Sequence, residues 1–133
     1  MGIVLWNKRI VKRTGANVSG RRGELFPHVE TTALATDHTQ GREVLEAARR
    51  IKEAFPEAHL ICGLSNVSYG LPNRKVLNRV FLTQTLTMGM DAFILNPLDN
   101  KLMGDLLAAQ ALLGQDPYCA NYLTAHRKGL YQE

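Results

Sequence analysis

The sequence has no apolar run that could span a bilayer, which excludes a membrane-spanning helix. Such a helix needs about 20 apolar residues, and the run at 2–6 is too short even for the core of a signal peptide. Cysteine is scarce: Cys62 and Cys119 lie far apart, so neither a disulfide framework nor a metal site is expected. The four histidines, too, have no metal-ligand spacing. We therefore expect a cytoplasmic protein that is not bound to a membrane and holds no metal of its own.

Acidic residues are absent from residues 1–23, although this segment carries six of the 16 Lys and Arg residues. The net charge of +4 therefore divides into +6 for residues 1–23 and −2 for the remaining residues. A basic arm can attract nucleic acid, but this one contains a single aromatic residue, Trp6, and no recognised nucleic-acid motif. We expect residues 1–27 to form an irregular, solvated and partly disordered basic arm. Nucleic-acid binding is the less favoured alternative.

The rest of the chain alternates between extended and helical patterns, and its composition is that of one soluble domain. The chain has 133 residues, of which 45% are hydrophobic and 21% charged. The expected strands are 28–35, 59–63 and 92–95, the expected helices are 40–55, 73–88 and 100–113, and residues 115–133 show no clear period. Strand and helix in alternation predict an α/β fold with a parallel sheet, either doubly wound or a (β/α) barrel.

Each expected helix has an apolar stripe that should face the core. Gly89 and Gly114 are placed to end the second and third helices, and Asp99 or Asn100 is placed to cap the start of the third. The stripe residues are Val44, Ala48, Ile51 and Phe55 in the first helix, Val76, Leu77, Val80, Phe81 and Met88 in the second, and Leu102, Leu106, Ala109 and Leu113 in the third.

A short apolar run ends abruptly in small and polar residues in the stretch "LICGLSNVSYGLPNR". Gly63 allows close approach of a ligand or backbone, and Ser65 and Asn66 both donate and accept hydrogen bonds. The stretch lacks the Lys-Ser/Thr pair of a phosphate-binding loop and the second glycine of a nucleophile elbow. Two interpretations remain: recognition of a neutral polar ring, or a turn whose side chains only cap a helix.

The run "GLSNVSYGLPNRKVLNRVFLTQTLTMGMDAFILNPLDNKLM" resembles the pterin-binding methyltransferases that move a methyl group from 5-methyltetrahydrofolate to a corrinoid protein. The likeness extends through "ATDHTQGREVLEAARRIKEAFP" and "AAQALLGQDPYCANYL", covering roughly residues 34–123. The family's fold is a (β/α)8 barrel, which typically needs about 250 residues. The resemblance therefore implies a partial barrel at 28–123, roughly the last three βα units, followed by a tail at 124–133. By this resemblance the strand around Val29–Ala35 would be the sixth of the barrel, and it departs from the family because His28-Val29-Glu30 replaces the family's Asp-Pro-Leu-type sequence.

The resemblance also implies a site and a chemistry. Asn66 would accept a hydrogen bond from the protonated N5 of the pterin, and Gly63, Ser65, Arg74 and Asn96 would contact the pterin around it. The methyl donor would be 5-methyltetrahydrofolate, and the acceptor would be the cobalt of a corrinoid carried by a partner protein.

A truncated barrel has open sheet edges, which a soluble monomer tolerates poorly. We therefore expect this chain to form a homo-oligomer or to pair with a complementary barrel chain. The alternative function is a non-catalytic barrel remnant or assembly module without folate turnover.

Overall fold

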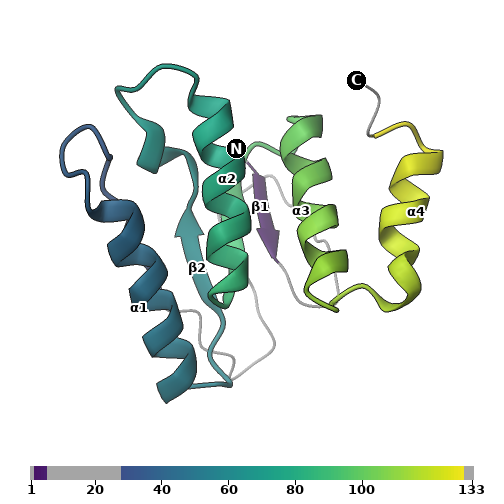
Figure 1. Ribbon diagram of the computed structural model, residues 1–133, viewed down its shortest axis with the longest axis horizontal. Helices are drawn as coiled ribbons and strands as arrows, with labels where there is room; N and C mark the ends of the chain where they lie inside the picture. Colours follow the sequence, from purple (N-terminus) through teal and green to yellow (C-terminus); the bar gives the residue numbers. More distant parts are fainter. Residues whose placement is uncertain (1, 6–27, 131–133) are drawn as a thin grey trace.

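The computed structural model describes residues 2–5 and 28–130, and in these residues the chain forms an α/β structure (Figure 1). A small sheet lies behind a layer of helices. The elements in chain order are β1 (Gly2–Leu5), α1 (Gln40–Ala54), β2 (Leu60–Gly63), the 3-10 turn η1 (Ser65–Ser68), α2 (Arg74–Thr87), β3 (Met90–Leu95), α3 (Asn100–Leu112), the 3-10 turn η2 (Pro117–Cys119) and α4 (Ala120–Arg127).

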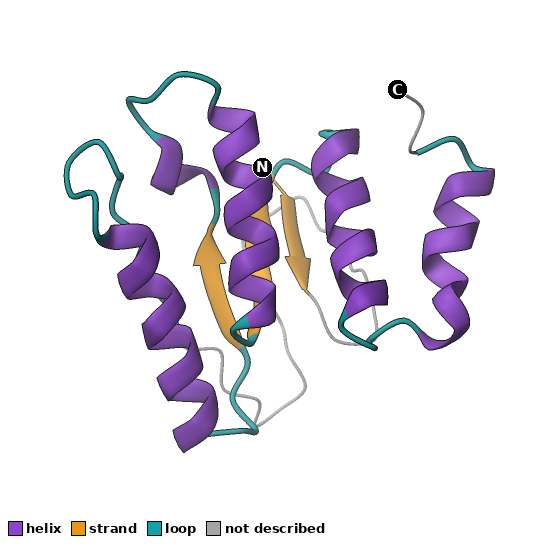
Figure 2. Cartoon of the chain, in the orientation of Figure 1, coloured by secondary structure: helices purple, strands orange, loops and turns teal. Residues whose placement is uncertain are grey.

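The sheet has the strand order β1-β3-β2 (Figure 2). β2 and β3 are parallel, with Cys62 opposite Phe93 and Gly63 opposite Ile94. Cys62 and Phe93 are fully buried in the core. Because side chains alternate along a strand, Ile94 points to the opposite face of the sheet, and a side chain at position 63 would do the same.

The prediction of a strand at 28–35 is mostly wrong. Only His28 forms a bridge, parallel to Ile61, and the Val29 amide donates to the Ile61 carbonyl at 2.8 Å. The chain then leaves the sheet, because the Leu34 amide donates to the carbonyl of Val67, a residue beyond β2 (3.0 Å). His28 and Val29 therefore lie beside β2, but the following residues do not continue as a strand.

The N-terminal residues also differ from the expected irregular arm. Gly2–Leu5 forms β1, which pairs antiparallel with β3 and places Gly2 opposite Leu95. Its sequence GIVL suits a strand, and pairing with it satisfies the backbone groups along the other edge of β3. Residues 6–27, which carry the basic residues of the predicted arm, lie outside the described residues.

The three expected helices are confirmed as α1, α2 and α3, with ends within one residue of the prediction. Gly89 and Gly114 follow α2 and α3 with φ of 104° and 73°, the left-handed conformation expected of them. The short helix α4 was not predicted, and it extends to Arg127, inside the expected tail at 124–133. None of the helices in the described part of the chain is long and apolar enough to cross a membrane.

The helices pack on the sheet through a core that the stripes predicted only in part. On α2 the buried residues are Phe81, Leu82, Thr85 and Leu86, whereas Val76 and Val80 are about half exposed (50% and 49%). The helix is thus rotated relative to the expected stripe. Phe55 is also exposed, because α1 ends at Ala54, one residue earlier.

An ion-pair cluster around Asp91 joins α1, β2 and β3 at the end of the sheet where the parallel strands begin. Asp91 Oδ2 accepts a hydrogen bond from the Leu60 amide at 3.0 Å. The same oxygen lies 2.8 Å from Lys52 Nζ and 3.6 Å from His59 Nδ1. Lys52 Nζ also donates to the Ala58 carbonyl at 2.6 Å. The cluster lies at the opposite end of the strands from the polar stretch after β2.

Candidate functional site

The candidate site lies where β2 and β3 end. Gly63 is the last residue of β2, and the next amide, that of Leu64, donates to the Ile94 carbonyl at 3.0 Å. A Cβ added at Gly63 would meet nothing within 4 Å, so the space beside this glycine is open. In parallel α/β proteins ligands bind at this carboxyl edge of the sheet. The structure thus leaves room for a ligand at the edge that the sequence indicated.

Asn66 is exposed on η1, directly after this edge. Its Nδ2 donates a hydrogen bond to the backbone carbonyl of Thr31, which belongs to the segment that leaves the sheet beside β2. This bond uses the amide nitrogen and turns the Oδ1 of Asn66 away from the Thr31 carbonyl. The side chain therefore presents a hydrogen-bond acceptor without introducing a charge.

Arg74 holds the η1 turn. Its Nη2 donates to the Ser65 carbonyl at 2.8 Å, and its Nε donates to Ser68 Oγ at 3.1 Å. Ser68 is fully buried, and its hydroxyl also lies 2.7 Å from Asn78 Oδ1. The Arg74 guanidinium carbon is 5.7 Å from the centre of the Tyr69 ring. Arg74 thus fixes the backbone that carries Asn66, while its contact with a pterin stays a prediction.

Asn96 follows β3 at the same edge. Its Oδ1 accepts from the Leu98 amide at 3.0 Å, which shapes the turn into α3. Asp99 Oδ1 accepts from the Leu102 amide at 3.2 Å, so the predicted capping role of Asp99 is confirmed. The structure places Gly63, Ser65 and Asn66 after β2 and Asn96 after the neighbouring strand β3. They share one edge of the sheet.

Cys62 precedes Gly63 but belongs to the core. Burial raises the pKa of the Cys62 thiol to about 12, so it stays protonated and is a poor nucleophile at neutral pH. Within the described ranges, no group of three or more His, Cys, Asp or Glu residues could hold a metal ion. Apart from the Arg74 guanidinium, the described site offers a ligand neutral hydrogen-bonding groups.

Sequence reasoning missed two contributors to the site, Thr31 and Asn78. Their roles depend on contacts with residues distant in sequence: Thr31 binds Asn66 through its backbone, and Asn78 binds Ser68 from α2.

The Thr31 side chain gives a test of the packing beside Asn66. Thr31 is 7% exposed, and its hydroxyl has no hydrogen-bond partner in the structure as described. Because a buried unpaired hydroxyl costs about 1–3 kcal/mol, Thr31→Val should raise the free energy of unfolding by about 1 kcal/mol in urea titrations. The backbone carbonyl that binds Asn66 is kept. Thr32→Val, at the exposed neighbour, is the control, and a loss of stability in Thr31→Val would contradict the absence of a hydrogen-bond partner for the Thr31 hydroxyl.

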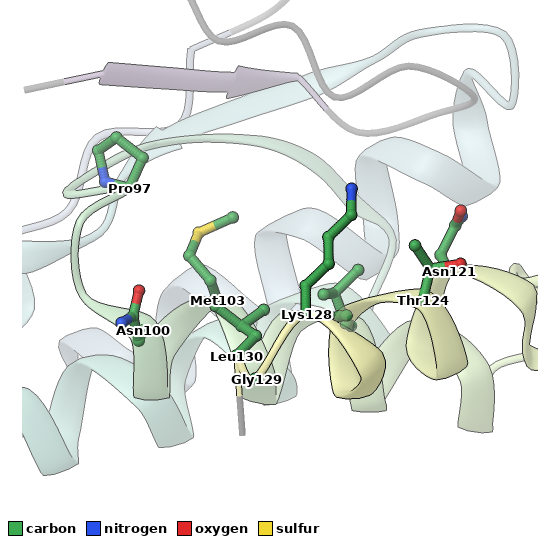
Figure 3. Close-up of a pocket in the computed structure, with 10 residues that line it drawn as sticks. Pro97, Asn100, Met103, Asn121, Thr124, Lys128, Gly129 and Leu130 are labelled. Atoms are coloured by element: carbon green, nitrogen blue, oxygen red, sulfur yellow. The ribbon is translucent and has the colours of Figure 1, made fainter. Parts of the chain in front are cut away.

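A groove of about 540 Å³ lies between α3 and α4 (Figure 3). None of the predicted site residues lines it, but it begins at Pro97 and Asn100, just after Asn96. Its apolar lining includes Met103 and Leu107 of α3. From α4 and the residues after it come Asn121, Thr124 and Lys128, among others. The groove and the Asn66 region therefore have different lining residues, and the groove includes the residue that follows Asn96 in the chain.

Comparisons with known proteins identify relatives but no matching family model. The chain is 38% identical over 113 residues to the methylcorrinoid:tetrahydrofolate methyltransferase of Eubacterium limosum, covering 85% of this chain and 41% of the relative. It is also 38% identical to the methionine synthases of Mycobacterium tuberculosis, over 72 residues, and of Mycobacterium leprae, over 95 residues. These matches cover 50% and 67% of this chain but 6% and 8% of the synthases. The chain thus spans about two fifths of the first relative and a small part of the others.

Proposed function

We infer that this chain, which belongs by sequence to the methyltetrahydrofolate:corrinoid methyltransferase family, forms part of a cytoplasmic pterin-binding domain. In that domain a methyl group passes from N5 of 5-methyltetrahydrofolate to the cobalt of a corrinoid protein. The observation that carries this proposal is Asn66 at the carboxyl edge of the sheet, with its Nδ2 bound to the Thr31 carbonyl. Open space at Gly63 supports the approach of a flat ring.

The proposed role of Asn66 follows from the chemistry of the leaving nitrogen. As the carbon–nitrogen bond breaks, its electron pair stays on N5, and a proton on N5 neutralises the charge that would otherwise develop. Asn66 Oδ1 accepts a hydrogen bond from that protonated N5 and adds no titratable group of its own. Ser65 and Asn96 contact the pterin edge, while Arg74 holds η1 and contacts the ring from the same turn.

The name of the Eubacterium limosum relative describes transfer from a methylated corrinoid to tetrahydrofolate, which is the reverse direction. The same side chain serves both directions, because the transition state is common to them. In the reverse direction Asn66 stabilises N5 as it gains the methyl group. The corrinoid partner and the supply of methyl donor then decide the net direction.

The chain covers about two fifths of that relative, so the proposed pocket needs further walls. We place this chain as the last three βα units of a (β/α)8 barrel. A complementary chain or a second copy supplies the remaining contacts, and a corrinoid protein docks above the carboxyl edge.

A second candidate is an assembly module that does not turn over folate. Two donors of Arg74 are already bound within the chain, to the Ser65 carbonyl and the Ser68 hydroxyl, which favours a structural role for this motif. The two candidates differ in whether the chain binds the methyl donor.

Titration calorimetry with 5-methyltetrahydrofolate, followed by a methyl-transfer assay with a corrinoid protein, tests the proposal. We expect saturable binding and a change in the corrinoid absorption spectrum that depends on this chain. Gln84→Ala, which removes an exposed amide from α2, should behave as the wild type. Absence of binding by the chain, both alone and with the corrinoid protein present, would favour the assembly module.

A further inference from the structure

We propose that Asn78 of α2 is a positioning residue for Asn66 and acts through the buried hydroxyl of Ser68. Ser68 Oγ lies 2.7 Å from Asn78 Oδ1, and Ser68 is fully buried. This inference rests on the proposed function, because it concerns the side chain to which that function assigns the methyl transfer. It adds a determinant of the Asn66 geometry on a helix residue that is not among the proposed pterin contacts.

The turn η1 (Ser65–Ser68) is held from two sides. On one side lies the segment beside β2, where the Thr31 carbonyl accepts from Asn66 Nδ2. The amide of Leu34, in the same segment, donates to the Val67 carbonyl at 3.0 Å. On the other side lies the start of α2, which contacts the two end residues of the turn. Each residue of η1 therefore has a hydrogen-bond partner outside the turn.

The contacts from α2 meet at the Ser68 hydroxyl. It accepts from Arg74 Nε at 3.1 Å, and two acceptors lie within reach of its proton. These are Asn78 Oδ1 at 2.7 Å and the Ser65 carbonyl at 3.0 Å. The Ser65 carbonyl already accepts from Arg74 Nη2 at 2.8 Å. Because a hydroxyl donates only one proton and the bond to Asn78 is the shorter, we assign the proton to Asn78.

The spacing of Arg74 and Asn78 explains why both reach the same hydroxyl. Residues four apart lie on one face of a helix, and these two are in the first turns of α2. Without Asn78, the Ser68 proton has only the Ser65 carbonyl, which belongs to the same turn. Arg74, whose side chain is exposed, would then be the remaining hydrogen-bonded link from α2 to η1. Asn78 therefore restricts the position of η1 and of the Asn66 side chain that it carries.

The test follows the side-chain amide resonance of Asn66 in the whole chain without folate. Asn78→Leu keeps the size of the side chain but removes the acceptor, so exchange of the amide proton bound to the Thr31 carbonyl should rise roughly tenfold. Asn78→Asp keeps an acceptor for Ser68 and should restore the wild-type resonance. Thr85→Val is the control. It removes a buried hydroxyl of α2 that bonds within the helix, so it should lower stability and leave the Asn66 resonance unchanged.

The rate of methyl transfer gives the second measurement. Asn78→Leu should lower kcat about tenfold with little change in KM, because a misplaced group weakens the transition state more than binding. Asn78→Asp should recover the rate, and Thr85→Val should keep it. If Asn78→Leu does not fold, Ser68→Ala breaks the same bond by removing one oxygen and should change the Asn66 resonance in the same way.

The outcomes separate this inference from the proposed function. An Asn66 resonance that is unchanged in Asn78→Leu, or changed equally in Thr85→Val, would overturn the positioning role of Asn78. A full rate of transfer in Asn78→Leu would overturn it as well. A changed resonance in Asn78→Leu, rescued in Asn78→Asp, would support the role even if the wild type transfers no methyl group. Absence of transfer by the wild type would contradict the proposed function alone.

Discussion

Asn66→Ala is expected to slow methyl transfer by about 100- to 1,000-fold, the range seen when one preorganised hydrogen-bonding group is removed from a transition state. The loss should appear mainly in kcat, because the bond to N5 strengthens as charge shifts in the transition state. The measurement is the rate of corrinoid demethylation or methylation with saturating folate. Gln84→Ala removes an amide of similar size from the exposed face of α2 and should keep the full rate.

Asn66→Asp tests the role of the amide nitrogen separately from that of the amide oxygen. Aspartate keeps an oxygen that can accept from N5, but it cannot donate to the Thr31 carbonyl, which the Asn66 Nδ2 now binds. Two oxygens would then face each other, and the carboxylate should turn away from its catalytic position. We expect a loss of rate approaching that of Asn66→Ala. A rate near that of the wild type would show that the Thr31 contact is dispensable, and an unimpaired Asn66→Ala would remove Asn66 from the mechanism.

Asp91→Ala should lower the free energy of unfolding by about 2 kcal/mol, because it removes a largely buried carboxylate and leaves the partly exposed Lys52 without its partner. The Asp91 side chain is 10% exposed and that of Lys52 is 22% exposed. The same substitution removes the acceptor of the Leu60 amide at the start of β2. Three elements lose a common partner, so the effect should exceed that of a surface ion pair.

The comparison for this prediction is Asp105→Ala on α3. Asp105 pairs with Arg79 of α2 at 3.0 Å, but its side chain is 44% exposed, and exposed pairs contribute about 0–1 kcal/mol. Urea denaturation of both variants gives the two free energies. If Asp91→Ala does not fold, Asp91→Asn, which retains an acceptor for the Leu60 amide, should fold with a smaller loss. Equal losses in the Asp91→Ala and Asp105→Ala variants would refute the special role of the Asp91 cluster.

The sequence predicted the elements whose signals are local. The periods of α1, α2 and α3 and the glycines that follow two of them were sufficient to place these helices within one residue. α4 could not be predicted in this way, because Ala125 is its only buried residue. Its start depends on the carboxylate of Asp116, which accepts from the amides of Asn121 and Tyr122, both at 3.0 Å.

In the site, too, the features with a local sequence signal were predicted and those that depend on distant residues were not. Gly63, Ser65 and Asn66 were recognisable as a polar turn after a buried strand, since composition and order alone suggest it. The partner of Asn66 is a backbone carbonyl 35 positions away, and no side-chain pattern identifies a carbonyl. The rotation of α2, which leaves Val76 and Val80 half exposed, likewise depends on packing between elements rather than on the helix itself.

The antiparallel pairing of β1 with β3 has a consequence for assembly. A closed barrel of the proposed kind places a parallel strand beside its last strand, yet in this chain that edge of β3 is held by Gly2–Leu5. Any chain that completes a ring through β3 must first displace a strand tethered to the same molecule, whose effective concentration stays high at every dilution. Closing a barrel through β3 therefore requires strand exchange. The stability of the pairing between Gly2–Leu5 and β3 sets the binding free energy that a partner strand must exceed.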